Sequence, residues 1–87
     1  MDIIVKKFEE ITLNRNVSDE KVGETFAFNL FYWFGKYEDT GDQYARNILK
    51  QSILSVERNR KNLFPRIWNR LNETHYDLLI DLFPERL

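Results

Sequence analysis

The sequence predicts an all-α domain, a compact bundle of four to five helices. Apolar residues recur every three to four positions along most of the chain, which is the period of an amphipathic helix. Only 3 Gly and 2 Pro occur in 87 residues, which disfavours a loop-rich or many-stranded fold. Polar stretches at 14–16 and 38–42 separate the periodic segments. At this length residues 1–87 are expected to form a single helical domain.

The first expected helix covers residues 2–13. Ile4, Phe8 and Ile11 fall on one stripe of such a helix. Asp2 stands where an N-cap is needed, because its carboxylate can accept from the first free backbone N–H groups. The β-branched opening at 3–5 leaves the start of a strand as the alternative.

The second expected helix begins after Ser18, a favourable N-cap, and runs to about Tyr37. It contains the aromatic stretch FAFNLFYWF at 26–34. Because this segment is apolar nearly all round, we expect it to be the central helix of the bundle.

A helical wheel divides this second helix into two sides at about 100° per residue. The side expected to face the core consists of Val22, Phe26, Leu30, Trp33 and Tyr37. The opposite side carries Phe28, Phe31 and Tyr32. Two interpretations remain open for these three aromatic residues. The other helices cover them, or they stay partly exposed as a contact surface for another protein.

Residues 43–60 form the clearest amphipathic helix, with Thr40 or Asp42 as its cap. Its apolar stripe consists of Ala45, Ile48, Leu49, Ser52, Ile53 and Val56. This pattern predicts a helix that is buried along one whole side.

A shorter helix is expected after Asn62, with Pro65 in its first turn, where proline is tolerated. Its core-facing positions are Phe64, Ile67, Trp68 and Leu71. A last helix is capped by Asn72 or Thr74 and ends at Pro84. Its expected apolar face consists of Tyr76, Leu79, Ile80 and Phe83.

Charge is unevenly distributed, although the net charge is only −1. Residues 1–42 carry nine acidic and five basic side chains, and residues 72–87 carry four acidic and one basic. Between them lies the basic segment 58–70, RNRKNLFPRIWNR, with Arg58, Arg60, Lys61, Arg66 and Arg70. Cations interleaved with aromatic residues can bind nucleic acid. The same segment can instead meet an acidic protein partner or form a solvated, self-neutralised rim.

Few groups in the sequence can carry chemistry. There is no cysteine, His75 is the only histidine, and no glycine-rich phosphate loop or G-x-S-x-G motif occurs. Acidic residues at 73, 77 and 81 share a face, but a solvated face is the simpler interpretation. We therefore expect no catalytic residue, no metal and no cofactor, and a protein that is not an enzyme.

The composition favours a non-enzymatic protein-binding module, most simply an inhibitor of the kind represented by immunity proteins, antitoxins and phage-encoded inhibitors. Its expected partner-binding residues are Phe28, Phe31, Tyr32, Arg58, Arg60, Lys61, Arg66 and Arg70. The alternatives are a nucleic-acid-binding domain using segment 58–70 and a structural homodimer. The acidic start Met1-Asp2 lacks a signal peptide's basic region, and the longest apolar run has five residues. We therefore expect no membrane span and a cytoplasmic location.

Overall fold

The computed structural model describes residues 2–87 and contains, over that range, five α-helices, one short 3-10 helix and no strand. The elements are α1 (Ile3–Leu13), α2 (Asp19–Thr40), α3 (Gln43–Asn59), α4 (Phe64–Thr74), α5 (Tyr76–Leu82) and the 3-10 helix η1 (Pro84–Arg86). This arrangement confirms the all-α bundle that the sequence predicts.

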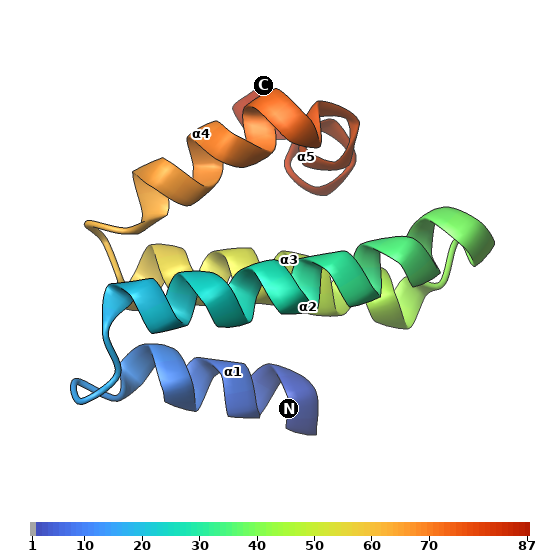
Figure 1. Cartoon of the computed structure of the whole chain (residues 1–87). Coiled ribbons are helices and arrows are strands. Elements are labelled where there is room, and N and C mark those ends of the chain that lie inside the picture. The colour runs from blue at the N-terminus through green and yellow to red at the C-terminus, as the bar shows by residue number, and fades with distance from the viewer. Residues whose placement is uncertain (1) are drawn as a thin grey trace.

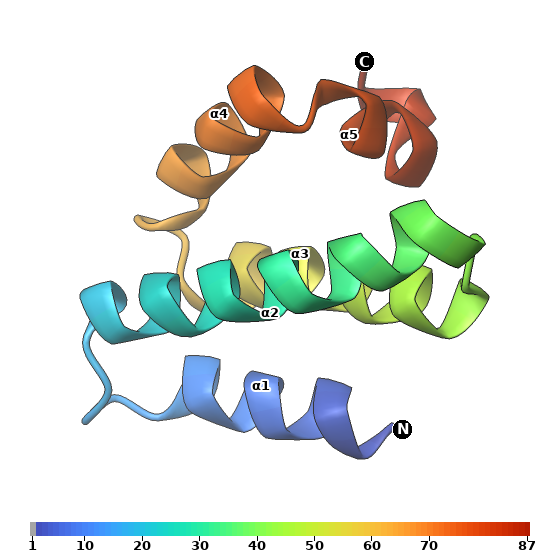
Figure 2. The same ribbon diagram turned by 45° about the vertical axis from the view of Figure 1, so that its right-hand side comes forward.

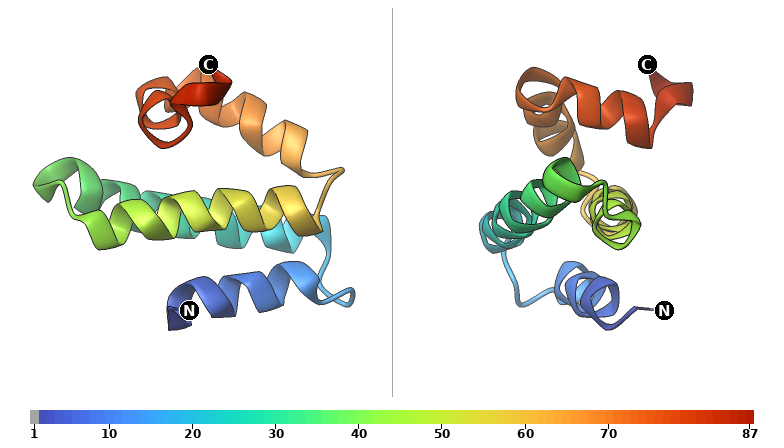
Figure 3. Two further views of the ribbon diagram at one scale, coloured as in Figure 1. Left: turned by 180° about the vertical axis from the view of Figure 1, so that it is seen from behind. Right: turned by 90° about the vertical axis from the view of Figure 1, so that its right-hand side faces the viewer.

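The helices stack in three layers, as Figure 1 shows. α2 and α3 lie side by side in the middle layer, α1 covers them on one side, and α4 with α5 lies on the other. The end-on view in Figure 3 separates the α2–α3 pair from the layers above and below it. α1 packs chiefly against α3. α3 is therefore the best-buried helix, with seven buried residues against two on α2.

α2 lies in the middle layer, but only one of its sides is enclosed. Val22 and Phe26 are buried, and the half-buried Leu30, Trp33 and Tyr37 pack against the same core. These are the five positions that the helical wheel assigns to the core. The opposite side stays open because α1 lies mainly on α3 and α4 rises away from α2 along its length (Figure 2).

The helix ends follow local capping chemistry. The Asp2 carboxylate accepts from the Ile4 N–H at 2.8 Å, and the Ser18 hydroxyl accepts from the Lys21 N–H at 3.1 Å. Both caps were expected from the sequence, and residues 3–5 are helical rather than extended. Gly41, with φ 68°, ends α2 in the left-handed conformation that glycine adopts without strain.

Two boundary predictions are wrong, and of the two caps expected for α3 the structure uses one. α2 continues beyond Tyr37 to Thr40, because the helix stops only where Gly41 reverses the backbone. Asp42, not Thr40, caps α3 by accepting from the Tyr44 N–H at 2.9 Å. Neither Asn72 nor Thr74 caps the last helix. Both belong to α4, which passes directly into α5 through His75 without a side-chain cap.

The C-terminal layer is held by aromatic contacts. The ring centroids of Trp68 and Phe83 lie 5.6 Å apart, and the Arg86 guanidinium lies 4.8 Å from the Phe83 centroid. Arg86 also donates two hydrogen bonds to Glu57 of α3, at 3.0 and 3.1 Å. Phe64 and Trp68 thus pack against the core, as their spacing predicts. The face expected for the last helix is confirmed in part: Leu79 and Phe83 are buried, whereas Tyr76 and Ile80 are exposed. Leu78 and Leu82 of α5 are buried instead.

No helix in the part of the chain from Asp2 to Leu87 combines the length and the apolar character needed to cross a membrane.

Candidate functional site

The outer side of α2 exposes three aromatic residues that the core does not use. Phe28 is 72% exposed, Phe31 is 85% exposed and Tyr32 is 49% exposed. The 3.6-residue period of the helix places them opposite Val22 and Phe26, and no other helix within residues 2–87 covers that side. The sequence leaves open whether other helices cover these side chains. In the structure of the single chain they are not covered.

These aromatic residues are carried by a long helix that is capped at both ends. α2 is 22 residues long, with Ser18 as its N-cap and Gly41 as its C-cap. The Tyr32 ring meets Trp33 edge-on at a centroid distance of 4.9 Å, and Lys36 Nζ lies 5.2 Å from the Tyr32 centroid. Tyr32 is therefore more restrained than Phe31, which projects furthest into solvent.

A groove runs between α2 and α4 beside this aromatic surface. Its volume is about 1180 Å³. The buried residues at its base are Phe26, Leu63, Ile67 and Leu71, and the half-buried Leu30 and Phe34 also line it. Phe31 and Tyr32 line the α2 wall, while Arg66 and Arg70 line the α4 wall. At its far end the Phe34 and His75 rings meet edge-on, with centroids 4.7 Å apart.

The structure separates the basic segment 58–70 into two places. Arg58, Arg60 and Lys61 line a smaller polar cleft of about 460 Å³ at the ends of α1 and α3. Arg66 and Arg70 lie on α4 and line the groove instead. The five cations therefore do not form one continuous stripe. Phe64 and Trp68, the aromatic residues between them, are used in packing.

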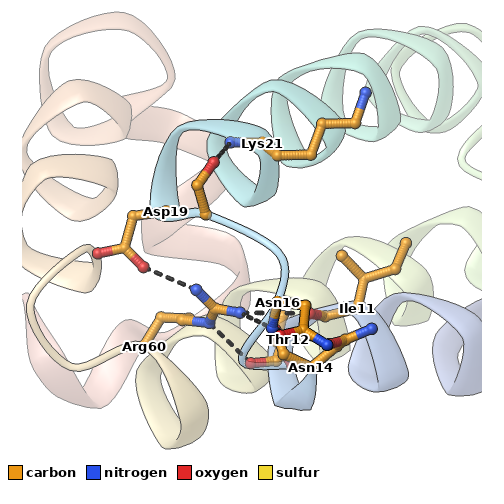
Figure 4. A network of polar contacts seen from close by, with 8 residues as sticks. Ile11, Thr12, Asn14, Asn16, Asp19, Lys21 and Arg60 are labelled. Atoms are coloured by element: carbon orange, nitrogen blue, oxygen red, sulfur yellow. Dashed lines mark hydrogen bonds and ion pairs between the residues drawn. The ribbon is translucent and has the colours of Figure 1, made fainter.

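Two of these cations are engaged within the fold. Arg58 forms an ion pair with Glu9 of α1. Arg60 is 12% exposed at its side chain and joins α3 to the α1–α2 connection, as Figure 4 shows. Its guanidinium donates to the Asp19 carboxylate at 2.9 Å and to the carbonyls of Thr12 and Asn14, each at 2.7 Å. Arg60 thus has a structural role at the centre of that cleft.

Another polar cluster joins the middle layer to α5. Tyr37 donates its hydroxyl to the Asp81 carboxylate, and Arg46 Nε donates to the same carboxylate at 3.1 Å. The Tyr37 hydrogen bond, followed by Arg46, lowers the pKa of Asp81 below its ordinary value. The same hydrogen bond raises the pKa of Tyr37, because the neighbouring carboxylate disfavours a phenolate.

The remaining candidates for chemistry are also used in the fold. The three acidic residues expected to share one face lie on two helices, because Glu73 belongs to α4 and Asp77 and Asp81 belong to α5. Asp81 interacts with Arg46 and Tyr37. Over residues 2–87 no group of three His, Cys, Asp or Glu side chains lies close enough to hold a metal ion. His75 lies at the α4–α5 junction, where its Nδ1 lies 2.7 Å from the Thr74 hydroxyl.

The groove is the feature that sequence analysis missed. It brings four expected partner-binding residues into one place: Phe31, Tyr32, Arg66 and Arg70. Phe28 lies on the adjacent outer side of α2, whereas Arg58, Arg60 and Lys61 lie elsewhere. One signal in the sequence pointed to it. Gly23 and Gly35 lie inside a long helix, and both line the groove.

Comparison with known proteins finds no family model that matches the chain, no matching curated protein and no matching solved structure.

Proposed function

We propose that the protein is a non-enzymatic protein-binding module whose partner docks on the outer side of α2. The observation that carries this proposal is the exposure of Phe28, Phe31 and Tyr32 on one capped helix. Aromatic side chains dominate the energetics of protein interfaces, and each buries about 150–250 Å² when it is covered. An aromatic surface of this kind, beside an apolar groove, is typical of a protein interaction site.

Binding on the outer side of α2 orders few flexible groups of this chain. A partner that docks on α2 meets side chains carried by a continuous helix, so little backbone ordering opposes association. The aromatic residues also have few rotatable bonds, which keeps the entropic cost of holding them low. Exposed charges at the rim, such as Lys36 and Glu38, set the orientation of a partner more than its affinity.

The finer form of the proposal is an inhibitor-type protein that neutralises one target, as immunity proteins, antitoxins and phage-encoded inhibitors do. Preorganised aromatic anchors on a short chain support this form, because tight one-to-one inhibition needs a surface that is ready before binding. The placement of the basic residues gives less support to a nucleic-acid-binding domain. Arg58 and Arg60 already bind carboxylates, and the other cations fall in separate places.

The first test is affinity capture with three matched baits. Tagged wild-type protein, the Phe28→Ala/Phe31→Ala variant and a Leu13→Ala variant are incubated with lysate of the encoding organism, and bound proteins are quantified by mass spectrometry. Leu13 is an exposed apolar residue on α1, so it controls for non-specific hydrophobic capture. The proposal expects one stoichiometric partner that wild type and Leu13→Ala retain and the double variant loses.

Binding of the purified partner is then measured by calorimetry. Loss of one central aromatic anchor is expected to weaken binding by about 2 kcal/mol or more. Light scattering of the protein alone separates this proposal from the structural homodimer. A stable dimer that Phe28→Ala/Phe31→Ala converts to monomer would assign the aromatic residues to self-association and reject a foreign target on α2.

A further inference from the structure

We infer that the groove between α2 and α4 binds an amphipathic α-helix of a partner protein, with acidic residues along the edge that faces α4. The inference rests on the proposed function, because it specifies the partner chemistry for the region beside the exposed aromatic residues. Three features of the groove support it: the length of the groove, the small residues of its α2 wall and the charge of its α4 wall.

The length of the groove suits a short helix. On α2 the lining residues extend from Gly23 to Glu38. Fifteen steps of about 1.5 Å give a length of about 22 Å, which is about four helical turns. The groove is bounded by two helices and has an apolar base, which is the arrangement that helix-in-groove recognition uses.

Small residues line the α2 wall and let a partner helix approach closely. Gly23, Ala27 and Gly35 all contribute to this wall. A Cβ atom added at Gly23 or Gly35 would meet nothing within 4 Å, so no packing within the chain requires glycine at either position. Glycine inside a helix is unfavourable relative to alanine. Close approach of a partner helix explains why glycine occupies these two positions, which no contact within the single chain explains.

The α4 wall supplies the charge complementarity. Arg66 and Arg70 are exposed and stand one helical turn apart. Four other arginines, Arg46, Arg58, Arg60 and Arg86, each form an ion pair with a carboxylate. Over residues 2–87 neither Arg66 nor Arg70 forms an ion pair, although Glu73 lines the same wall near its end. A partner helix with acidic side chains one turn apart places them opposite these two cations.

The experiment uses two fluorescein-labelled peptides of about 14 residues, enough for the three to four turns required. Both carry the same Leu and Phe residues at i, i+3, i+4 and i+7. One has Glu at two edge positions a turn apart, and the other has Lys at those positions. Fluorescence anisotropy against the full chain is expected to show about tenfold tighter binding of the Glu peptide at low salt. The difference should shrink as salt is added.

Variants of the protein assign this binding to the groove. Arg66→Glu/Arg70→Glu should reverse the preference, so that the Lys peptide binds more tightly. Arg66→Gln/Arg70→Gln should abolish the preference, and it serves if the charge reversal disturbs folding. Ala27→Trp places a bulky side chain in the groove and should weaken the binding of both peptides about tenfold or more. Asn47→Trp makes the same addition on the exposed side of α3 and should leave both affinities unchanged.

Several outcomes overturn the inference. Equal affinities of the two peptides, no binding of either, or binding that Ala27→Trp leaves unchanged would each reject it. A wild-type dimer that Ala27→Trp converts to monomer would assign the groove to a second copy of the chain. The proposed function fails separately. Suppose that the Phe28→Ala/Phe31→Ala variant loses the captured partner but neither peptide binds in the groove. That combination supports the proposed function and rejects only this inference.

Discussion

Arg60 Nη1 lies 2.9 Å from Asp19 Oδ1, which joins the C-terminal end of α3 to the first turn of α2. The same guanidinium donates to the backbone carbonyl of Thr12 near the end of α1. The last carbonyls of a helix have no partner within it, and α1 has no basic residue in its own last turn. A side chain distant in sequence therefore caps α1.

Arg60→Ala should destabilise the fold by about 2–4 kcal/mol, because it leaves several carbonyls and a carboxylate without a donor. Arg60→Lys should recover only part of this, since an ammonium group cannot reach all of these acceptors together. Urea unfolding followed by circular dichroism measures the free energy. Arg58→Ala is the control: that side chain is 48% exposed, so its ion pair with Glu9 should contribute less than about 1 kcal/mol. Equal losses for the two variants would contradict the structural role of Arg60.

Gly23→Ala and Gly35→Ala should each stabilise the isolated protein by about 0.5–1 kcal/mol. Both positions lie inside α2, and an added Cβ meets nothing within 4 Å. The melting temperature should rise by about 4–8 °C for each kcal/mol gained. Gly41→Ala should instead destabilise by about 1–2 kcal/mol, because its φ of 68° is strained for any residue with a Cβ. A loss of stability in Gly23→Ala would mean that the added Cβ clashes with a neighbouring group, so that the space beside Gly23 is smaller than the structure shows.

Truncation of the exposed aromatic residues should leave the fold intact. Phe28→Ala and Phe31→Ala should each change the free energy of unfolding by no more than about 0.5 kcal/mol, as surface substitutions do. Phe26→Ala, on the opposite side of the same helix, should cost about 3–5 kcal/mol because Phe26 is buried and packs on Phe8. Thermal unfolding of the three variants compares them directly. Unfolding of Phe28→Ala or Phe31→Ala would show that these residues belong to the core.

Asp81 should make stability depend on pH in the acid range. Its pKa is lowered from 3.8 by the Tyr37 hydrogen bond and by Arg46, so its contribution is complete above pH 3.8 and is lost as the pH falls through the lower folded-state value. Asp81→Asn should therefore be less stable than wild type at pH 7, and the difference should disappear in strong acid. The side chain is 41% exposed, so solvent screening limits the difference to about 1 kcal/mol or less.

Glu73→Gln is the matched control for that measurement, because Glu73 forms no ion pair within residues 2–87. Urea unfolding at a series of pH values gives the free energies. A constant difference between wild type and Asp81→Asn across the acid range would show that the Tyr37 and Arg46 contacts do not favour the charged carboxylate.

Local features were predictable from sequence where a few neighbouring residues decide them. Asp2 and Ser18 cap their helices because each carboxylate or hydroxyl needs only the backbone two or three residues onward. The helical period places Phe28 and Phe31 on the side opposite Val22 and Phe26, but only the packing of the other helices decided that this side stays exposed. The end of α4 was predicted less well, because Asn72 and Thr74 have cap chemistry but both lie inside α4, which ends at Thr74 and packs against α5.

The sequence by itself determined the helical elements, the amphipathic face of each and the absence of cysteine chemistry, because these depend on local propensity and period. Only the tertiary structure decided that α3 is the best-buried helix, that Arg60 caps α1 and that a groove separates α2 from α4. The reason is that these relationships depend on the directions in which helices pack after their short connections. Apolar periodicity predicts which face of a helix packs in the core, but it does not predict which other helix packs against that face.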